Sequence, residues 1–331
     1  MKYFVTGATG FIGGSLARQL VADGHKVIAL VRDPAKAQNL ADLGITLAPG
    51  DITDKESMRA PLTGVDGVYH IAGWYKIGTR DKSGGQKINV EGTRNVLELM
   101  RDLGIPRGVY TSTLAIFSDT HGKILDESYR YDGPHLSEYD RTKWVAHYEV
   151  ADPMIARGLP LIIVQPGLVY GIGDTSAMHD TLVQYLLRKL PVAPQKTAYC
   201  WAHVDDIARG HILAMEKGNL GESYIIAGQV CSLIDALALA EKITGIPAPH
   251  LHPAPGVLKA ASGLMRVVEK VIPMPELYSS ETVRISAGVT YLGSNEKAKR
   301  ELGYSVRPLE DGLREMFLHD MQQLGISKKK A

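Results

Sequence analysis

The sequence has little of what marks secreted, metal-binding or nucleic-acid-binding proteins. Its 331 residues include only two cysteines, Cys200 and Cys231, too few for a disulfide framework or a cysteine-based zinc site. The formal net charge is +1, so no basic surface for nucleic acid is expected, and the lysine run at 328–330 is expected to be a solvated tail. No apolar run is long enough for a membrane helix, and the chain opens on a strand without an apolar signal region. We therefore expect a cytoplasmic protein without nucleic-acid, membrane or metal partners.

A glycine-rich turn stands near the start of the chain. Residues 6–13 read Thr-Gly-Ala-Thr-Gly-Phe-Ile-Gly, after the apolar run 3–5, which predicts a strand, and before a stretch of helical periodicity. The N–H groups at a helix N-terminus bind phosphates, and glycines let the backbone approach them closely. The spacing is G-x-x-G-x-x-G instead of the usual G-x-G-x-x-G, and an ordinary glycine-rich loop is the alternative. We expect a dinucleotide site made by Gly7, Thr9, Gly10, Phe11, Ile12 and Gly13.

Apolar runs alternate with helical patterns over the first half of the chain. Short runs without polar alternation are typical of buried parallel strands, and they occur at 27–31, 45–47, 67–71, 108–110, 161–164 and 223–227. This order predicts an α/β fold with a doubly wound parallel sheet of the Rossmann type. Ligands bind outside the carboxyl ends of such strands, so we expect four residues to be neighbours there: Asp51, Ile52, Ala72 and Thr113.

Two polar residues at strand ends bear on the choice of cofactor. Arg32 follows the second strand, where an NAD site usually has an acid. An arginine suits the 2′-phosphate of NADP, so we expect NADP(H), with NAD as the alternative. A surface pair of Arg32 with Asp33 would be the purely structural explanation. Asp51 is expected either to bind the adenine amino group or to cap the next helix.

The strict alternation ends after Gly171. We expect one helix at 180–189 within an otherwise irregular segment 172–203, and mostly helices after Cys231, at 233–244, 257–271, 295–302 and 309–324. The predicted organisation is a Rossmann domain of residues 1–171 and 204–230 with a smaller, mostly helical substrate-binding cap of residues 172–203 and 231–331. The apolar residues of 257–272 recur at helical spacing, which favours a core-facing or lid helix over a membrane anchor.

Tyr139 and Lys143 stand four residues apart in a predicted helix, so they share one helical face. Pro153 is expected to kink or end this helix early. A hydride that reaches a carbonyl carbon leaves charge on the oxygen, which requires a proton donor. Tyr139 would be that donor, and the ammonium of Lys143 would lower the phenol pKa from its ordinary value of about 10.

Taken together, these motifs resemble the extended short-chain dehydrogenase/reductase family over nearly the whole chain. The residues that carry the resemblance are 6–13, 50–51, Thr113, Tyr139 with Lys143, and 203–206. Segments 31–34 and 89–93 are most similar to dihydroflavonol-reductase-like enzymes and their bacterial epimerase/dehydratase relatives. The resemblance implies a catalytic set of Thr113, Tyr139 and Lys143, with Ser112 as the alternative to Thr113. It also implies cofactor contacts from Tyr139, Lys143, Pro166 and Val169.

Several other residues have both a structural and a functional interpretation. His203 and the two aspartates after it suggest a metal site, but helix capping is preferred because no further ligand has metal spacing. His70 ends a buried strand and is expected to be structural. Four aromatic residues are expected either to line a substrate pocket or to lie in the core: Trp74, Tyr75, Tyr170 and Trp201.

The sequence thus predicts an oxidoreductase that transfers a hydride between NADP(H) and a carbonyl/alcohol pair. Few cations lie between Gly171 and His203 to hold a diphosphate, which favours an apolar or aromatic small-molecule substrate. A nucleotide-sugar epimerase on the same fold and a non-catalytic NADP-binding regulatory protein are the alternatives. A homodimer formed through the helices near 89–103 and 139–150 is left open beside a monomer.

Overall fold

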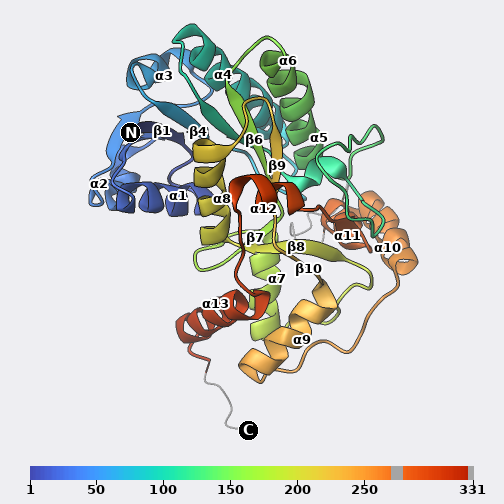
Figure 1. The fold of residues 1–331 in the computed structure, drawn as a ribbon. Helices are drawn as coiled ribbons and strands as arrows, with labels where there is room; N and C mark the ends of the chain where they lie inside the picture. Colours follow the sequence, from blue (N-terminus) through green and yellow to red (C-terminus); the bar gives the residue numbers. More distant parts are fainter. Residues whose placement is uncertain (270–278, 327–331) are drawn as a thin grey trace.

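A seven-stranded parallel sheet forms the centre of the computed structural model, which describes residues 1–269 and 279–326 (Figure 1). Its strands are β1 (Lys2–Thr6), β2 (Lys26–Val31), β3 (Thr46–Pro49), β4 (Gly67–His70), β5 (Gly108–Thr111), β6 (Leu161–Pro166) and β9 (Ser223–Ile226). They run in the order β3-β2-β1-β4-β5-β6-β9. The order reverses between β1 and β4, where a doubly wound sheet opens a crevice at its carboxyl edge. The predicted doubly wound α/β fold is confirmed.

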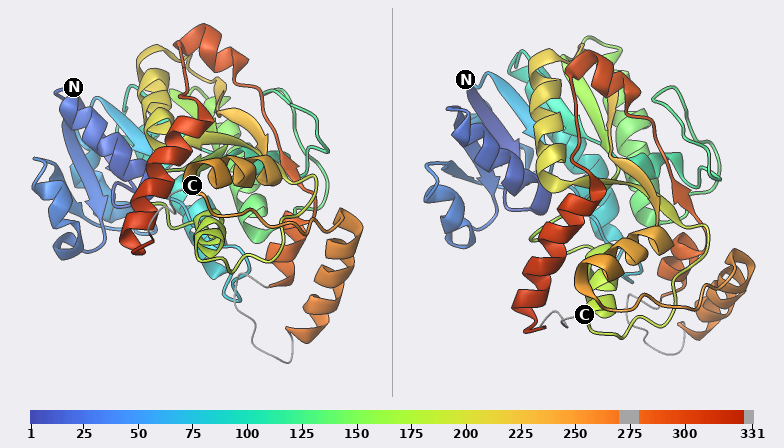
Figure 2. Two further views of the ribbon diagram at one scale, coloured as in Figure 1. Left: turned by 90° about the horizontal axis from the view of Figure 1, so that it is seen from below. Right: turned by 60° about the horizontal axis from the view of Figure 1, so that its bottom comes forward.

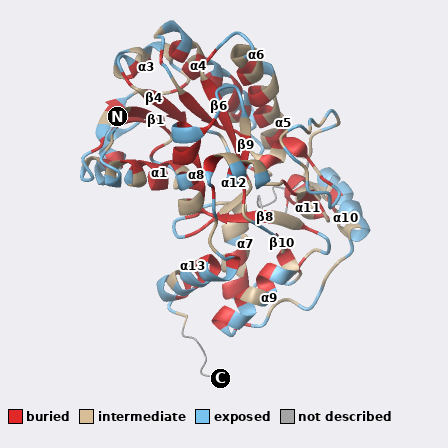
Figure 3. Ribbon diagram, viewed as in Figure 1, coloured by how far each residue is buried: buried red, intermediate tan, exposed pale blue. Residues whose placement is uncertain are grey.

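Successive residues of the central strands serve two separate hydrophobic cores. Phe4 and Tyr110 pack under α3 (Lys55–Leu62) and α4 (Thr93–Asp102), whereas Val5 and Val109 pack under α1 (Phe11–Ala22) and α8 (Val204–Lys217). Because both faces of the sheet are covered, its strands need apolar residues at every position. Figure 3 shows these strands as almost entirely buried. Short helical segments complete this half of the chain: η1 (Pro34–Ala37), α2 (Gln38–Ala41), η2 (Gly85–Gly92) and η3 (Leu114–Phe117).

The helix that carries Tyr139 runs further than the sequence suggests. α5 (Glu138–Val145) continues through the π-helical η4 (Ala146–Ala151) into α6 (Asp152–Ile155). Pro153 was expected to kink or end this helix early, and the helical stretch ends two residues after it, at Ile155. Proline has no N–H to donate within a continuous helix, and the π-helical η4 directly precedes α6. A kink at Pro153 stays a prediction.

The cap contains a second, small sheet that the sequence analysis missed. β8 (Ala198–His203) lies between β10 (Gln229–Ser232) and β11 (Thr290–Tyr291), and β7 (Leu168–Tyr170) also pairs with it. We expected irregular structure around 198–203. Cys200 packs into one hydrophobic cluster and Trp201 into another, so this strand is buried on both faces and shows no polar alternation.

Most helices in segments 172–203 and 231–331 match the predicted ranges, whereas the helix at 280–286 was not predicted. The helices of these segments are α7 (Ala177–Leu186), α9 (Leu233–Thr244), α10 (Pro255–Val268), α11 (Ser280–Ser286), α12 (Glu296–Leu302) and α13 (Leu309–Gln323). α10 packs on α11 and projects at the edge of the molecule (Figure 2). The predicted end of α10 at 270–272 and the lysine run 328–330 lie outside the described residues. Over the part of the chain that the structure describes, no helix is both long and apolar enough to cross a membrane.

One part of the predicted cap belongs elsewhere in space. α12 packs against α8 and β9, and its Ala298 and Leu302 enter the same core as α1. Residues 231–331 are therefore not all in the cap, because the chain returns to the central sheet before α13. The remaining division into two domains stays a prediction.

Candidate active site

The glycine-rich turn after β1 has the shape of a phosphate cradle. Gly7 has φ +75°, and a Cβ there would come within 2.7 Å of the Ala72 backbone nitrogen. A Cβ on Gly13 would overlap the Gly7 carbonyl oxygen. α1 begins at Phe11 after Gly10, whose position offers no side-chain cap. Within the described residues, the N–H groups of 11–13 have no acceptor, as a bound diphosphate requires.

The residues expected at the carboxyl edge of the sheet make different kinds of contact. Ala72 lies directly against Gly7, as expected for adjacent strands. Ile52 is buried with its side chain against Gly92, so this side chain belongs to the core. Asp51 accepts a hydrogen bond from the Thr53 N–H at 2.8 Å, and the cap of α3 is Asp54. The helix-capping alternative for Asp51 was therefore wrong, because the helix begins later; adenine binding stays a prediction.

Arg32 is exposed and free to bind an anion. In the part of the chain that the structure describes, its guanidinium has no hydrogen bond or ion pair. Asp33 turns away from it, accepting from the Ala35 N–H at 3.1 Å and lying 3.5 Å from Lys36 Nζ. The surface Arg32–Asp33 pair is therefore not formed.

This arrangement predicts a preference for NADPH over NADH that depends on Arg32. A charge-assisted contact to phosphate contributes roughly 1.5–3 kcal/mol, so Arg32→Ala is expected to weaken NADPH binding about tenfold or more. NADH binding should change little. Titration of both cofactors against the parent protein, Arg32→Ala and the control Lys36→Ala measures this. Equal affinities of the parent for NADPH and NADH would contradict the prediction.

Thr113 and Tyr139 meet at the carboxyl edge of β5. Tyr139 lies in the first turn of α5, which is capped by Ser137. Burial raises the pKa of Tyr139 to about 12, and a hydrogen bond with the Thr113 side chain opposes that rise. Ser112 instead has its Oγ 2.8 Å from His147 Nδ1, away from the phenol. The geometry favours Thr113 over Ser112 as the hydroxyl next to Tyr139.

Lys143 is buried one turn further along α5. Its Nζ donates to the Thr111 carbonyl oxygen at 2.6 Å and to the Tyr110 hydroxyl at 3.1 Å. No carboxylate among the described residues pairs with it, and burial lowers the pKa of Lys143 to about 7. The expectation that Lys143 lowers the phenol pKa of Tyr139 does not hold in this structure. Burial of Tyr139 raises its pKa, and the Lys143 ammonium donates to two neutral oxygens instead. A buried ammonium with only neutral acceptors fits a site completed by ribose hydroxyl groups.

Of the four expected aromatic residues, Tyr75 lies directly on Tyr139. Tyr75 is half-exposed and packs its ring edge-to-face on Tyr139, with centroids 4.8 Å apart. Tyr199 and Tyr291 stack on each other at 6.1 Å, and Tyr291 donates to Asp140 Oδ2 at 3.1 Å. These two residues were not among the four aromatic candidates, and they lie on β8 and on the two-residue strand β11.

Of the other aromatic candidates, two are buried in a hydrophobic core and one lies in the loop after β4. Tyr170 and Trp201 are buried in the cap core, where the Trp201 indole donates to the Cys231 carbonyl oxygen at 3.0 Å. Trp74 is held by Asn89, whose side chain accepts from the Trp74 N–H at 2.7 Å and donates to its carbonyl oxygen at 3.0 Å. Asn89 therefore fixes the loop that leads to Tyr75.

The candidate metal ligands have structural roles. His203 caps α8 by accepting from the Asp205 N–H, and Asp206 pairs with Arg307 at 3.0 Å. His70 lies between the hydroxyls of Thr6 and Thr93 at 2.8 and 3.0 Å. Across residues 1–269 and 279–326, no cluster of three ligand side chains could hold a metal ion. Of the other predicted cofactor residues, Pro166 ends β6 and Val169 lies on β7 beside it.

Comparison with known proteins places this site in a family. A model of the NAD dependent epimerase/dehydratase family matches residues 3–227. The chain belongs to this family. It is 34% identical over 255 residues to a Synechocystis protein provisionally named dihydroflavonol 4-reductase, covering 75% of this chain and 74% of that protein. It is 29% identical over 313 residues to a 4-hydroxy-2-methyl-3-oxo-4-farnesyl-3,4-dihydroquinoline-1-oxide ketoreductase of Stigmatella aurantiaca, covering 93% and 92%.

A solved structure agrees with this assignment. The crystal structure of gox2253 superposes with a TM-score of 0.85 at 30% identity, over 98% of this chain and 99% of that one. The resemblance to extended, dihydroflavonol-reductase-like enzymes is thereby confirmed. The chain is an enzyme of the class that contains NAD-dependent oxidoreductases and epimerases.

Proposed function

We propose that this enzyme is an NADP(H)-dependent carbonyl reductase or alcohol dehydrogenase for an apolar or aromatic small molecule. The observation that carries the proposal is the grouping of Thr113, Tyr139 and buried Lys143 at the strand edge beside the glycine cradle. When bound, the nicotinamide cofactor supplies or accepts the hydride. Residues 7–13 would hold its diphosphate, Arg32 its 2′-phosphate and Lys143 its ribose.

Tyr139 is proposed as the general acid in the reducing direction. With a pKa of about 12, its phenol keeps its proton at neutral pH and can donate it to the carbonyl oxygen as negative charge develops there. Thr113 would hold the same oxygen by a hydrogen bond and so orient the carbonyl. In the oxidising direction the steps reverse, and the proton of the alcohol oxygen passes to the Tyr139 oxygen as the hydride leaves the carbon.

The residues around Tyr139 support an apolar or aromatic substrate. Tyr75 packs on Tyr139, and the stacked pair of Tyr199 and Tyr291 lies near Tyr75 and Asp140. The three cations between Gly171 and His203, namely Arg188, Lys189 and Lys196, are all exposed at the surface. A sugar nucleotide needs cations turned inward to bind its diphosphate.

We expect NADPH oxidation with aromatic or alicyclic aldehydes and ketones, and no saturable binding of UDP- or dTDP-sugars. The first part is measured by absorbance of NADPH over a carbonyl panel, and the second by calorimetry with UDP-glucose and UDP-galactose. Micromolar binding of either sugar nucleotide would favour the epimerase alternative. Cofactor binding without turnover of any carbonyl would favour a regulatory protein.

A further inference from the structure

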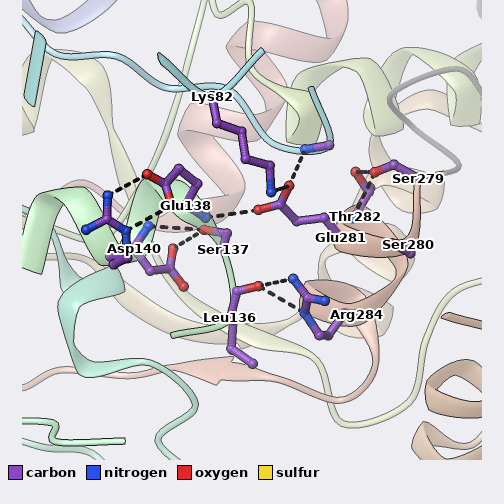
Figure 4. A network of polar contacts seen from close by, with 12 residues as sticks. Lys82, Leu136, Ser137, Glu138, Asp140, Ser279, Ser280, Glu281, Thr282 and Arg284 are labelled. Carbon is purple, nitrogen blue, oxygen red and sulfur yellow. Dashed lines mark hydrogen bonds and ion pairs between the residues drawn. The ribbon is translucent and has the colours of Figure 1, made fainter. Parts of the chain in front are cut away.

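One buried carboxylate joins the two segments that carry Tyr75 and Tyr139. Glu281, in the first turn of α11, is only 6% exposed. Its Oε1 accepts a hydrogen bond from the Glu138 N–H at 3.0 Å, and its Oε2 accepts one from the Gly78 N–H at 3.2 Å. Glu138 directly precedes Tyr139, and Gly78 lies three residues after Tyr75. The side chain therefore spans from the start of the catalytic helix to the loop beyond β4 (Figure 4).

The surroundings of Glu281 stabilise its negative charge. Lys82 Nζ lies 3.2 Å from Oε2, on the same loop as Gly78. The Glu138 N–H belongs to the positive end of α5, where a carboxylate is favoured. Both carboxylate oxygens are thus engaged, which is what a buried charge requires.

α11 is itself fixed, so Glu281 acts from a defined position. On one side, Ser280 donates from its N–H and its hydroxyl to Glu269, the residue directly after α10, at 2.9 and 2.6 Å. On the other side, Arg284 Nε donates to the Leu136 carbonyl oxygen at 3.0 Å, just before the cap of α5. Figure 4 shows the Arg284–Leu136 link beside Glu281.

We propose that Glu281 is a positioning residue that fixes the loop 75–82 against the start of α5 and so holds the Tyr75 ring against Tyr139. The inference rests on the proposed function, because it assigns the Tyr75–Tyr139 contact to one wall of the substrate pocket. Release of the loop would open that wall to water and loosen substrate binding. The glycine cradle is not among the contacts of Glu281, so cofactor binding would be retained.

Glu281→Gln tests this role with little change in shape. The substitution replaces one carboxylate oxygen by an amide NH2 group, which cannot accept a hydrogen bond. This group must face the N–H of either Gly78 or Glu138, so one of the two hydrogen bonds is lost. We expect the KM for an aromatic ketone to rise about tenfold, with kcat within about threefold and the Kd of NADPH within about twofold. We also expect trypsin to cleave the loop after Lys76 and Arg80 about fivefold faster, as followed by mass spectrometry.

Glu127→Gln is the matched control, since the Glu127 carboxylate also accepts a backbone hydrogen bond, from the Ile225 N–H at 2.8 Å, and among the described residues makes no hydrogen bond or ion pair with α11 or the loop 75–82. Both readouts should stay within about twofold of the parent. An unchanged KM and cleavage rate in Glu281→Gln would overturn the inference, as would equal changes in Glu127→Gln. If no ketone is reduced by the parent, the proposed function fails, and the cleavage rate alone decides whether Glu281 holds the loop.

Lys82→Met keeps the proposal testable if Glu281→Gln does not fold. It removes the ion pair and leaves both backbone hydrogen bonds of Glu281 in place. We expect a rise in KM of about threefold and faster cleavage after Lys76, with both effects reversed in Lys82→Arg. Lys82→Met behaving like the parent in both measurements would contradict the proposal.

Discussion

Tyr139→Phe is expected to lower kcat/KM for a ketone substrate by about 10²–10⁴-fold, the range typical of a lost general acid. The substitution removes one oxygen and keeps the ring that packs on Tyr75. The Kd of NADPH should stay within about twofold, because the glycine cradle and Lys143 are untouched. Steady-state kinetics with NADPH and a reducible ketone, alongside cofactor titration, measure both quantities.

Tyr148→Phe provides the control for this prediction. Tyr148 lies on the same continuous helix, and its hydroxyl donates to the Tyr129 carbonyl oxygen at 3.2 Å, outside the site. Its loss should leave kcat/KM within about twofold of the parent. Near-normal turnover by Tyr139→Phe would exclude Tyr139 as the proton donor.

Gly13→Ala is expected to weaken cofactor binding about 100-fold or more, as displacement of a site by about 1 Å can do. A Cβ at this position would overlap the Gly7 carbonyl oxygen, which is backbone and cannot turn aside. The start of α1 must therefore move away from the turn after β1. The same overlap should lower the free energy of unfolding by about 1–3 kcal/mol.

Gly14→Ala separates this effect from a general effect of alanine in α1. A Cβ on Gly14 would lie 3.4 Å from the Ala8 carbonyl oxygen, an ordinary contact. The greater helix propensity of alanine should make this variant as stable as the parent, or more stable by about 0.5–1 kcal/mol. Calorimetric titration with NADPH and thermal unfolding test both variants. Parent-like cofactor affinity in Gly13→Ala would contradict the proposed cradle.

The central sheet and the glycine turn could be predicted because their signals are local. Buried parallel strands are short apolar runs, and a turn that needs glycine at Gly7 and Gly13 shows this directly in the residue type. The Tyr139–Lys143 spacing likewise follows from one helical turn. These features depend on neighbours in the chain, so the sequence alone was sufficient for them.

The substrate side of the site could not be predicted in the same way. Tyr291 of β11 contacts Asp140 and Glu281 of α11 contacts Glu138, the two neighbours of Tyr139 in the chain, and Tyr199 of β8 stacks on Tyr291. Only the folded chain brings these distant residues together. Tyr170 and Trp201 have the same amphipathic character but are buried, and nothing in the residue type distinguishes the two outcomes. The pKa of Tyr139 was misjudged because burial depends on the whole surrounding structure.

Transfer of deuterium to an aromatic ketone from NADPH deuterated at C4, with the 4R and 4S forms used separately, tests the central claim most directly. After incubation with the parent enzyme, mass spectrometry and NMR of the product locate the label. The account predicts an alcohol with deuterium on the former carbonyl carbon, and about 10²–10⁴-fold less labelled product per unit time with Tyr139→Phe. Two results together would contradict the account: no labelled alcohol is formed from any member of a broad carbonyl panel, and the enzyme converts UDP-glucose to UDP-galactose.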